Sequence, residues 1–286
     1  MIKKFIILIC YFRPTETKKT LDCLRKLYKI NEYELVVVRQ EGNDPDCLKV
    51  KQLIDDIDWM PLHHLTTSYS NNETVRIKVN QNTFKGLNYA FENCNADLSI
   101  LIEDDICLGY DALHFFEEIH KKYDKDPLFR AAIALSFLPF SKEHLYSYGK
   151  FRFGIGKGVG ISRHKWFSFY KKKWPYKEDN YYDSHLATAL KMGYVIMPYC
   201  ARSYEIGWGQ KAMNAKVKVE LFDQQKKSWV NTKKFTISDY VFDNSFKHHF
   251  RRDCKKYSWF SPIEFILLRL FRKSMTLIGI TIKSEI

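Results

Sequence analysis

Short, strongly apolar segments alternate with helical patterns along the first half of the chain. Phe5–Tyr11, Leu35–Val38 and Leu98–Ile102 are rich in aliphatic and β-branched residues, as is typical of strands buried on both faces. Apolar residues at helical spacing occupy the ranges 15–29, 47–57, 75–93 and 111–123. Because strands that alternate with helices form parallel sheets, the sequence predicts an α/β fold with a mostly parallel sheet and helices on both faces.

The second half of the chain is less regular. Its predicted elements are strands over 131–138 and 194–198 and helices over 163–173 and 183–192. Four glycines between Gly154 and Gly160 predict a turn before the first of these helices, and Glu205–Lys218 is predicted to be a loop. No repeat or low-complexity linker divides the chain. We therefore predict one domain over residues 1–243 and a C-terminal appendage over residues 244–286.

The N-terminal apolar run resembles a signal peptide only superficially. It ends at Phe12, before Arg13-Pro14, and no small-residue cleavage site follows it. The run is also too short to span a bilayer, so a buried strand is the better interpretation. The 7 cysteines occur singly and without a CxxC pair, which favours free thiols in a reducing compartment over a structural zinc site. We expect a cytoplasmic protein.

The charge of the chain favours anionic partners. Lys and Arg number 46 and Asp and Glu 33, which gives a net charge of +13. The densest basic cluster, between Lys247 and Lys273, holds eight Lys and Arg residues mixed with aliphatic and aromatic residues. Such a segment can lie at a membrane interface and bind anionic lipid, although an amphipathic helix packed on the core is the alternative. We expect peripheral binding to the inner face of the cell membrane.

Three acidic residues directly follow the predicted strand Leu98–Ile102: Glu103, Asp104 and Asp105. In open α/β sheets ligands bind at the carboxyl ends of the strands. A carboxylate there can hold a divalent cation, and the cation can stabilise a departing nucleoside diphosphate. The alternative is an acidic turn that caps the next helix.

Two further segments carry candidate functional residues. Arg13 follows the first predicted strand and lies at the same sheet edge, where it could bind a phosphate or a base edge. Asp183 follows Tyr181 and Tyr182 at the start of a predicted helix. It could be the general base that deprotonates an attacking hydroxyl, with the aromatic residues stacking on a sugar, or it could be a helix N-cap.

Together and in this order, these segments resemble the N-acetylglucosaminyltransferase I group of inverting glycosyltransferases, which have the GT-A fold. The resemblance covers about residues 5–231. The motifs that carry it are Arg13-Pro14-Thr15, Val36–Gly42, Ile77–Leu87, Ile100–Asp105, Asp111–Phe116, Gly156–Gly160 with Trp166, Lys173-Trp174-Pro175 with Tyr182-Asp183, and Leu221–Gln224. The acid triplet alone is not specific, but several motifs in the same order and at similar spacing are.

The resemblance implies roles for the acidic residues. It implies that Asp105 is a direct ligand of Mn²⁺ (or Mg²⁺) and that Asp104 lies near the nucleotide. It also implies that the segment with Asp183 supplies the catalytic base, and that a loop ending near Leu221–Gln224 closes over the donor. Closure of the loop would exclude water and limit hydrolysis of the donor.

The chain departs from the family pattern in residues expected near the nucleotide. Glu41 stands where the family uses an Asp to hold the uridine, and Asn82 stands where the family can place a His near the donor. The base is followed by Ser184-His185, where the family commonly has a second acid. The resemblance implies that Arg13, Glu41 and Asn82 contact the donor, while these departures leave the donor sugar open.

The sequence therefore predicts a metal-dependent inverting glycosyltransferase. We expect a UDP-sugar donor, with UDP-GlcNAc first, and a glycan or lipid-linked acceptor. One alternative is a nucleotidyltransferase acting on a sugar phosphate, but these enzymes usually carry a glycine-rich signature after the first strand, and Phe12–Thr15 contains no glycine. The other is a non-enzymatic nucleic-acid-binding protein. Because the basic cluster is mixed with aliphatic residues, it suits lipid better, and we expect no nucleic-acid partner.

Overall fold

The computed structural model describes residues 2–69, 73–136, 138–151, 156–179, 182, 193–207, 229–230 and 233–245. The predicted helix over 183–192 lies outside these residues. Most of the predicted loop 205–218 and all of the appendage beyond residue 245 also lie outside them. The division of the chain near residue 243 stays a prediction.

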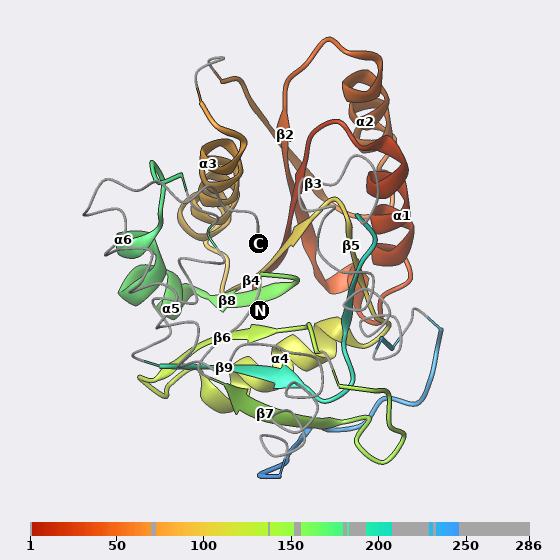
Figure 1. Cartoon of the computed structure of the whole chain (residues 1–286), viewed down its shortest axis with the longest axis vertical. Coiled ribbons are helices and arrows are strands. Elements are labelled where there is room, and N and C mark those ends of the chain that lie inside the picture. Colours follow the sequence, from red (N-terminus) through yellow and green to blue (C-terminus); the bar gives the residue numbers. More distant parts are fainter. Residues whose placement is uncertain are drawn as a thin grey trace, which may run out of the picture.

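A sheet of nine strands forms the centre of the described molecule (Figure 1), in the order β11-β7-β9-β6-β8-β4-β1-β2-β3. The strands are β1 (Lys4–Cys10), β2 (Glu34–Gln40), β3 (Leu62–Thr67), β4 (Leu98–Glu103), β6 (Phe129–Ile133), β7 (Ser147–Phe151), β8 (Val159–Ser162), β9 (Tyr194–Pro198) and β11 (Val241–Phe242). Strands β1 to β4 are parallel, and β8 runs antiparallel to β4 and β6. The mostly parallel sheet predicted from the sequence is confirmed.

Helices cover both faces of the sheet, as predicted (Figure 1). The helices are α1 (Pro14–Leu24), α2 (Pro45–Asp55), α3 (Val75–Asn88), α4 (Ala112–Tyr123), α5 (Arg163–Lys165) and α6 (Lys171–Lys173), with π-helical turns at Tyr89–Asn93 and Trp166–Tyr170 and a 3₁₀ turn at Ile30–Glu32. Helices α1, α2 and α4 bury their apolar residues on the face of Ile6 and Leu8. Helix α3 and the α5–α6 segment pack on the face of Ile7 and Ile9. Alternate residues of β1 thus serve opposite layers of the core.

A small second sheet connects distant parts of the sequence. Its strands β5 (Ile106–Leu108) and β10 (Ser203–Glu205) are antiparallel, and they pair Glu205 with Ile106. Strand β5 begins directly after Asp105, so the pairing carries the chain near residue 205 to the acid triplet. The sequence did not predict this sheet.

Other differences from the prediction are local. Strand β3 was not predicted, and the strand expected over 131–138 forms at Phe129–Ile133 instead. The glycine-rich turn leads into β8 before the helix begins, with Gly158 in the left-handed region at φ +80°. The described cysteines are free, as expected. No helix in the described part of the chain is long and apolar enough to cross a membrane.

Candidate active site

The predicted nucleotide- and metal-binding residues follow the carboxyl ends of neighbouring parallel strands. Arg13 follows β1, Glu41 follows β2, and Asp104 and Asp105 follow β4. In the register of β1 and β4, Ile9 lies opposite Glu103, so both strands end at the same level. The order of the strands therefore gathers these residues along one edge of the sheet, as the sequence predicted.

Arg13 binds both aspartates of the triplet. Its Nη1 donates to Asp105 Oδ2 at 2.8 Å, and its Nη2 donates to Asp104 Oδ1. The aspartate side chains are almost fully buried, and 17% of the Arg13 side chain is exposed. Burial lowers the pKa of Arg13, but the two carboxylates outweigh it and leave this pKa above its ordinary value. The guanidinium therefore stays charged and holds the aspartates in place.

One Arg13 guanidinium does not balance the negative charge at this edge. Burial raises the pKa of Asp104, and the neighbouring charge of Asp105 raises it further against the effect of Arg13. The charge of Asp105 also raises the pKa of the nearby Glu205, and the charge of Arg13 lowers it. Among the described residues, Arg13 is the ion-pair partner of both Asp104 and Asp105, and Lys157 is the ion-pair partner of Glu205. A divalent cation would stabilise the charged form of the two aspartates.

The donor atoms also fit a divalent cation. Asp105 Oδ1 is buried and has no hydrogen-bond partner among the described residues. Such an atom is costly in a native structure unless a ligand satisfies it. Carboxylate oxygens are the ligands that Mg²⁺ and Mn²⁺ prefer. Asp105 and Asp104 are therefore the residues that could hold the metal.

The segment after β10 packs directly against Asp105. Ile206 N donates to the Asp105 carbonyl at 2.8 Å. A Cβ on Gly207 would lie 2.1 Å from Asp105 Oδ2 and 2.9 Å from Arg13 Nη1, so the close approach requires glycine. Glu205 accepts from Lys157 Nζ at 3.0 Å, and burial raises the pKa of Glu205. Neither Glu205 nor Lys157 was predicted as a site residue.

Asp183 itself lies outside the described residues, but the preceding Tyr182 is fixed beside the acid triplet. The Tyr182 hydroxyl lies 3.1 Å from both Glu103 Oε1 and the Gly156 carbonyl and can donate to either. Its ring stacks on Trp174, with centroids 5.6 Å apart and planes at 13°. Trp174 Nε1 in turn donates to the Asn80 carbonyl at 2.9 Å. The chain next to Asp183 thus lies at the same sheet edge as Asp104 and Asp105.

Glu41 and Asn82 lie farther along the edge. Glu41 is exposed, and its backbone N donates to the Thr67 carbonyl at 2.8 Å. Asn82 is buried in α3. Its side-chain oxygen Oδ1 accepts from Thr67 Oγ1 at 2.9 Å and from the Tyr69 hydroxyl at 2.5 Å. Within the described ranges, no hydrogen bond or ion pair joins either residue to Arg13. Asn82 can therefore offer a ligand only its amide nitrogen, whereas the Glu41 carboxylate is accessible.

Comparisons with known proteins establish the fold. No protein-family model and no curated protein sequence matches the chain. The mannosyltransferase PcManGT from Pyrobaculum calidifontis, solved with GDP-Man and Mn²⁺, aligns with a TM-score of 0.51 and 15% identity over 75% of this chain and 59% of its own. TarS 1–349 of S. aureus, solved with UDP-GlcNAc, aligns with a TM-score of 0.50 and 11% identity over 76% of this chain and 61% of its own.

These alignments confirm the predicted GT-A fold. At such low identity they show the fold alone, and the chain spans only about six-tenths of the length of either protein. The resemblance to the N-acetylglucosaminyltransferase I group in particular stays a prediction.

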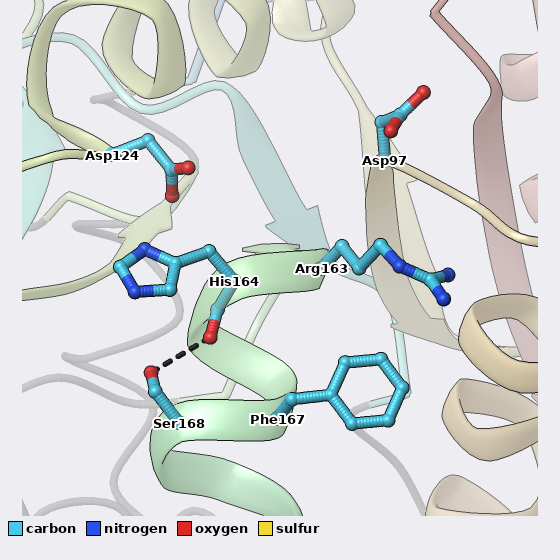
Figure 2. Close-up of a pocket in the computed structure, with 6 residues that line it drawn as sticks. All are labelled: Asp97, Asp124, Arg163, His164, Phe167 and Ser168. Atoms are coloured by element: carbon cyan, nitrogen blue, oxygen red, sulfur yellow. Dashed lines mark hydrogen bonds between the residues drawn. The ribbon is translucent and has the colours of Figure 1, made fainter.

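A pocket of about 620 Å³ lies at the opposite end of β4 (Figure 2). Asp97 precedes β4, and Arg163 follows β8, whose end pairs with the start of β4. Arg163 donates to the Phe91 carbonyl and lies over the Phe167 ring, so its charge is already engaged. The pocket contains none of the predicted site residues.

A second group of potential metal ligands lies between α4 and residues 233–240. The ligand atoms of His114, Glu118 and Asp239 lie within 4.8 Å of one another. Glu118 accepts from Tyr240 N at 3.4 Å, and the His114 ring binds the Ser238 carbonyl at 3.2 Å. These contacts already join the two segments, and the group includes neither Asp104 nor Asp105.

Proposed function

We propose that the chain is a metal-dependent glycosyltransferase that uses a nucleotide-sugar donor. The observation that carries the proposal is the contact of Arg13 with Asp104 and Asp105 at the carboxyl edge of a GT-A sheet. Among the residues that the structure describes, Asp105 Oδ1 has no hydrogen-bond partner. The two similar proteins were solved with GDP-Man and Mn²⁺ and with UDP-GlcNAc, which supports this class of donor. We propose a UDP-sugar, with UDP-GlcNAc first.

The residues at the edge would divide the work of binding the donor. Asp105, helped by Asp104, would hold Mn²⁺ or Mg²⁺, which would neutralise the charge that develops on the departing nucleoside diphosphate. Arg13 carries a planar fork of donors that suits phosphate oxygens as well as carboxylates. Glu41 and the amide nitrogen of Asn82 would contact the nucleoside.

The inverting mechanism requires a base on the acceptor side. We propose Asp183 for this role, in which it takes the proton of the acceptor hydroxyl as that oxygen attacks the anomeric carbon. The attack occurs on the face opposite the leaving diphosphate, which inverts the configuration. The contacts of Tyr182 with Glu103 and Trp174 support a position of the adjacent Asp183 near the donor.

The acceptor is proposed to be a glycan or a lipid-linked glycan. A lipid-linked acceptor would lie at the membrane, where the basic segment between Lys247 and Lys273 could bind anionic lipid. The full chain should then sediment with anionic vesicles and less with neutral ones. A chain ending at Ser245, which keeps the buried Tyr240, should lose this binding. Equal sedimentation of both chains would contradict the membrane role of the segment.

A donor panel tests the proposed function. The purified chain would be incubated with Mn²⁺ and UDP- or GDP-sugars, with and without a crude glycolipid extract, and nucleotide release would be measured. We expect release from one donor class that requires the metal, increases with the extract and disappears in Asp105→Asn.

Asp97→Asn is the matched control. Asp97 is exposed at the other end of β4, where it accepts from Lys3 N at 2.8 Å. This variant should keep the wild-type rate. Metal-dependent release that survives in Asp105→Asn would refute the assigned ligand, and the absence of release from every donor would refute the proposed function.

A further inference from the structure

A basic pocket lies at the far end of α1 from Arg13. Its volume is about 540 Å³, and it is lined by Arg25, Lys26, Leu27, Tyr28, Lys29, Tyr110 and Lys234. Tyr28 N donates to the Tyr110 carbonyl at 2.8 Å. The Tyr110 ring packs on Phe235 with centroids 5.5 Å apart. Three separate segments of the chain are therefore held together around this basic pocket.

The lining of the basic pocket has one sign of charge. Four of its seven residues are Lys or Arg, and none is acidic. Lys29 is paired with Glu117 at 3.0 Å. Within the described part of the chain, Arg25, Lys26 and Lys234 have no carboxylate within ion-pair distance, although all three line the same pocket. Like charges that line one pocket without counter-charges favour binding of an anion.

Helix geometry explains only part of this arrangement. Basic residues at the C-terminal end of a helix interact favourably with its dipole, which accounts for Arg25 and Lys26 after α1. It does not account for Lys234, which comes from a segment about two hundred residues later. Nor does it account for Lys29, which is held at φ 65°, in a region that residues other than glycine rarely adopt.

The tyrosines make the pocket suitable for phosphate oxygens. The rings of Tyr28 and Tyr110 are half-buried, with centroids 6.1 Å apart. No hydrogen bond of either hydroxyl occurs among the described residues, so both can donate to a ligand. Phosphate offers several acceptor oxygens and negative charge, which match hydroxyl and cationic donors. The volume is in the range of small-molecule sites, roughly 300–1,000 Å³.

We propose that the basic pocket is a second anion site that binds a phosphate group. It is separate from the donor edge, because the 11 residues of α1 span roughly 16 Å between Arg13 and Arg25. The phosphate could belong to an anionic lipid headgroup or to a soluble ligand. The inference does not depend on the proposed glycosyltransferase activity.

Titration with inorganic pyrophosphate tests the proposal. Binding would be measured by calorimetry at low salt, with EDTA present to prevent metal-mediated binding at the donor edge. The test variant combines Arg25→Gln, Lys26→Gln and Lys234→Gln, three exposed side chains. The control combines Lys121→Gln, Lys125→Gln and Lys172→Gln, which are also exposed and remove the same charge.

We expect the test variant to bind pyrophosphate at least tenfold more weakly than the wild type, and the control to stay within about twofold. Equal affinities of the two variants would overturn the proposal, because binding would then depend only on net charge. Thermal unfolding at wild-type temperature shows that the test variant is folded, and unchanged Mn²⁺–UDP binding shows that the donor edge is intact.

Vesicles identify the source of the phosphate. If the test variant also loses sedimentation with phosphatidylglycerol vesicles while the control keeps it, the pocket binds lipid headgroups. If only pyrophosphate binding is lost, it binds a soluble phosphate.

Discussion

Replacing Arg13 with Gln should change the affinities for metal and for nucleotide in opposite directions. Arg13 contacts Asp104 and Asp105, the proposed metal ligands, so its positive charge opposes a cation there. The same guanidinium is proposed to bind the diphosphate. Arg13→Gln should therefore strengthen the binding of Mn²⁺ alone and weaken the binding of UDP in the presence of Mn²⁺.

The expected size follows from the geometry. Two unit charges about 4 Å apart interact by about 4 kcal/mol at an effective dielectric constant of 20. The Arg13 side chain is 17% exposed, so solvent and counter-ions screen part of this energy. About 1.4–3 kcal/mol of relief would raise the Mn²⁺ affinity roughly 10- to 100-fold. Hydrogen bonds to charged groups contribute about 1.5–3 kcal/mol each, so UDP affinity should fall by a similar factor.

Two titrations measure these changes. Electron paramagnetic resonance of free Mn²⁺ gives metal affinity without nucleotide, and calorimetry gives UDP affinity at saturating Mn²⁺. Lys19→Gln removes the same charge from an exposed position on α1 and should leave both affinities unchanged. If Arg13→Gln binds Mn²⁺ alone no better than the wild type, Arg13 is not the counter-charge of a metal site, and the proposed position of the metal is wrong.

Three further predictions address the base, a buried histidine and a buried ion pair. Asp183→Asn should leave UDP-sugar binding nearly intact while transfer falls about 10²–10⁴-fold; transfer within a few-fold of wild type would place the base elsewhere. Burial lowers the pKa of His120 to about 4, below its ordinary 6.5. The unfolded chain therefore binds more protons between these values, and His120 should reduce the free energy of unfolding by up to about 3 kcal/mol as pH falls from 7 to 4. Urea unfolding of His120→Gln should show a correspondingly weaker dependence of the free energy of unfolding on pH. A dependence identical to that of the wild type would show that His120 is not its cause. In the wild type, Nε of the fully buried Arg202 lies 2.6 Å from Asp111 Oδ1. Asp111→Asn removes this counter-charge and should lower the free energy of unfolding by about 3–5 kcal/mol. A loss below about 1 kcal/mol in denaturant titrations would contradict this prediction.

The strands that the sequence predicted well are those buried on both faces. In β1, every residue from Phe5 to Cys10 is almost inaccessible, so the apolar run marks the strand directly. Strand β3 was missed because it lies at the edge of the sheet and reads Leu-His-His-Leu-Thr-Thr. His63 obtains its partners from Glu34 and Tyr89, which are distant in sequence. A polar edge strand of this kind has no local pattern that distinguishes it from a loop.

The candidate site was predictable where its residues directly follow strands. Arg13, Asp104 and Asp105 satisfy this condition, and knowledge of the sheet order alone places them at one edge. Glu205 and Lys157 do not. Glu205 reaches the site through the pairing of β5 with β10, a ladder of three residue pairs between segments about a hundred residues apart. Lys157 reaches it through its ion pair with Glu205. The only local signals were the glycines beside them, including Gly207, whose close approach to Asp105 became visible only in the fold.

Arg13 partly compensates the charge of the two aspartates at the sheet edge. Adjacent buried carboxylates such as Asp104 and Asp105 would repel each other and lose their hydration, a cost that burial imposes on any unpaired charge. Arg13 offsets part of this cost with contacts to both aspartates. Because Asp105 Oδ1 has no hydrogen-bond partner in the part of the chain that the structure describes, the compensation is incomplete. The unbalanced charge that remains in the folded chain is what would favour a dication together with its bound diphosphate.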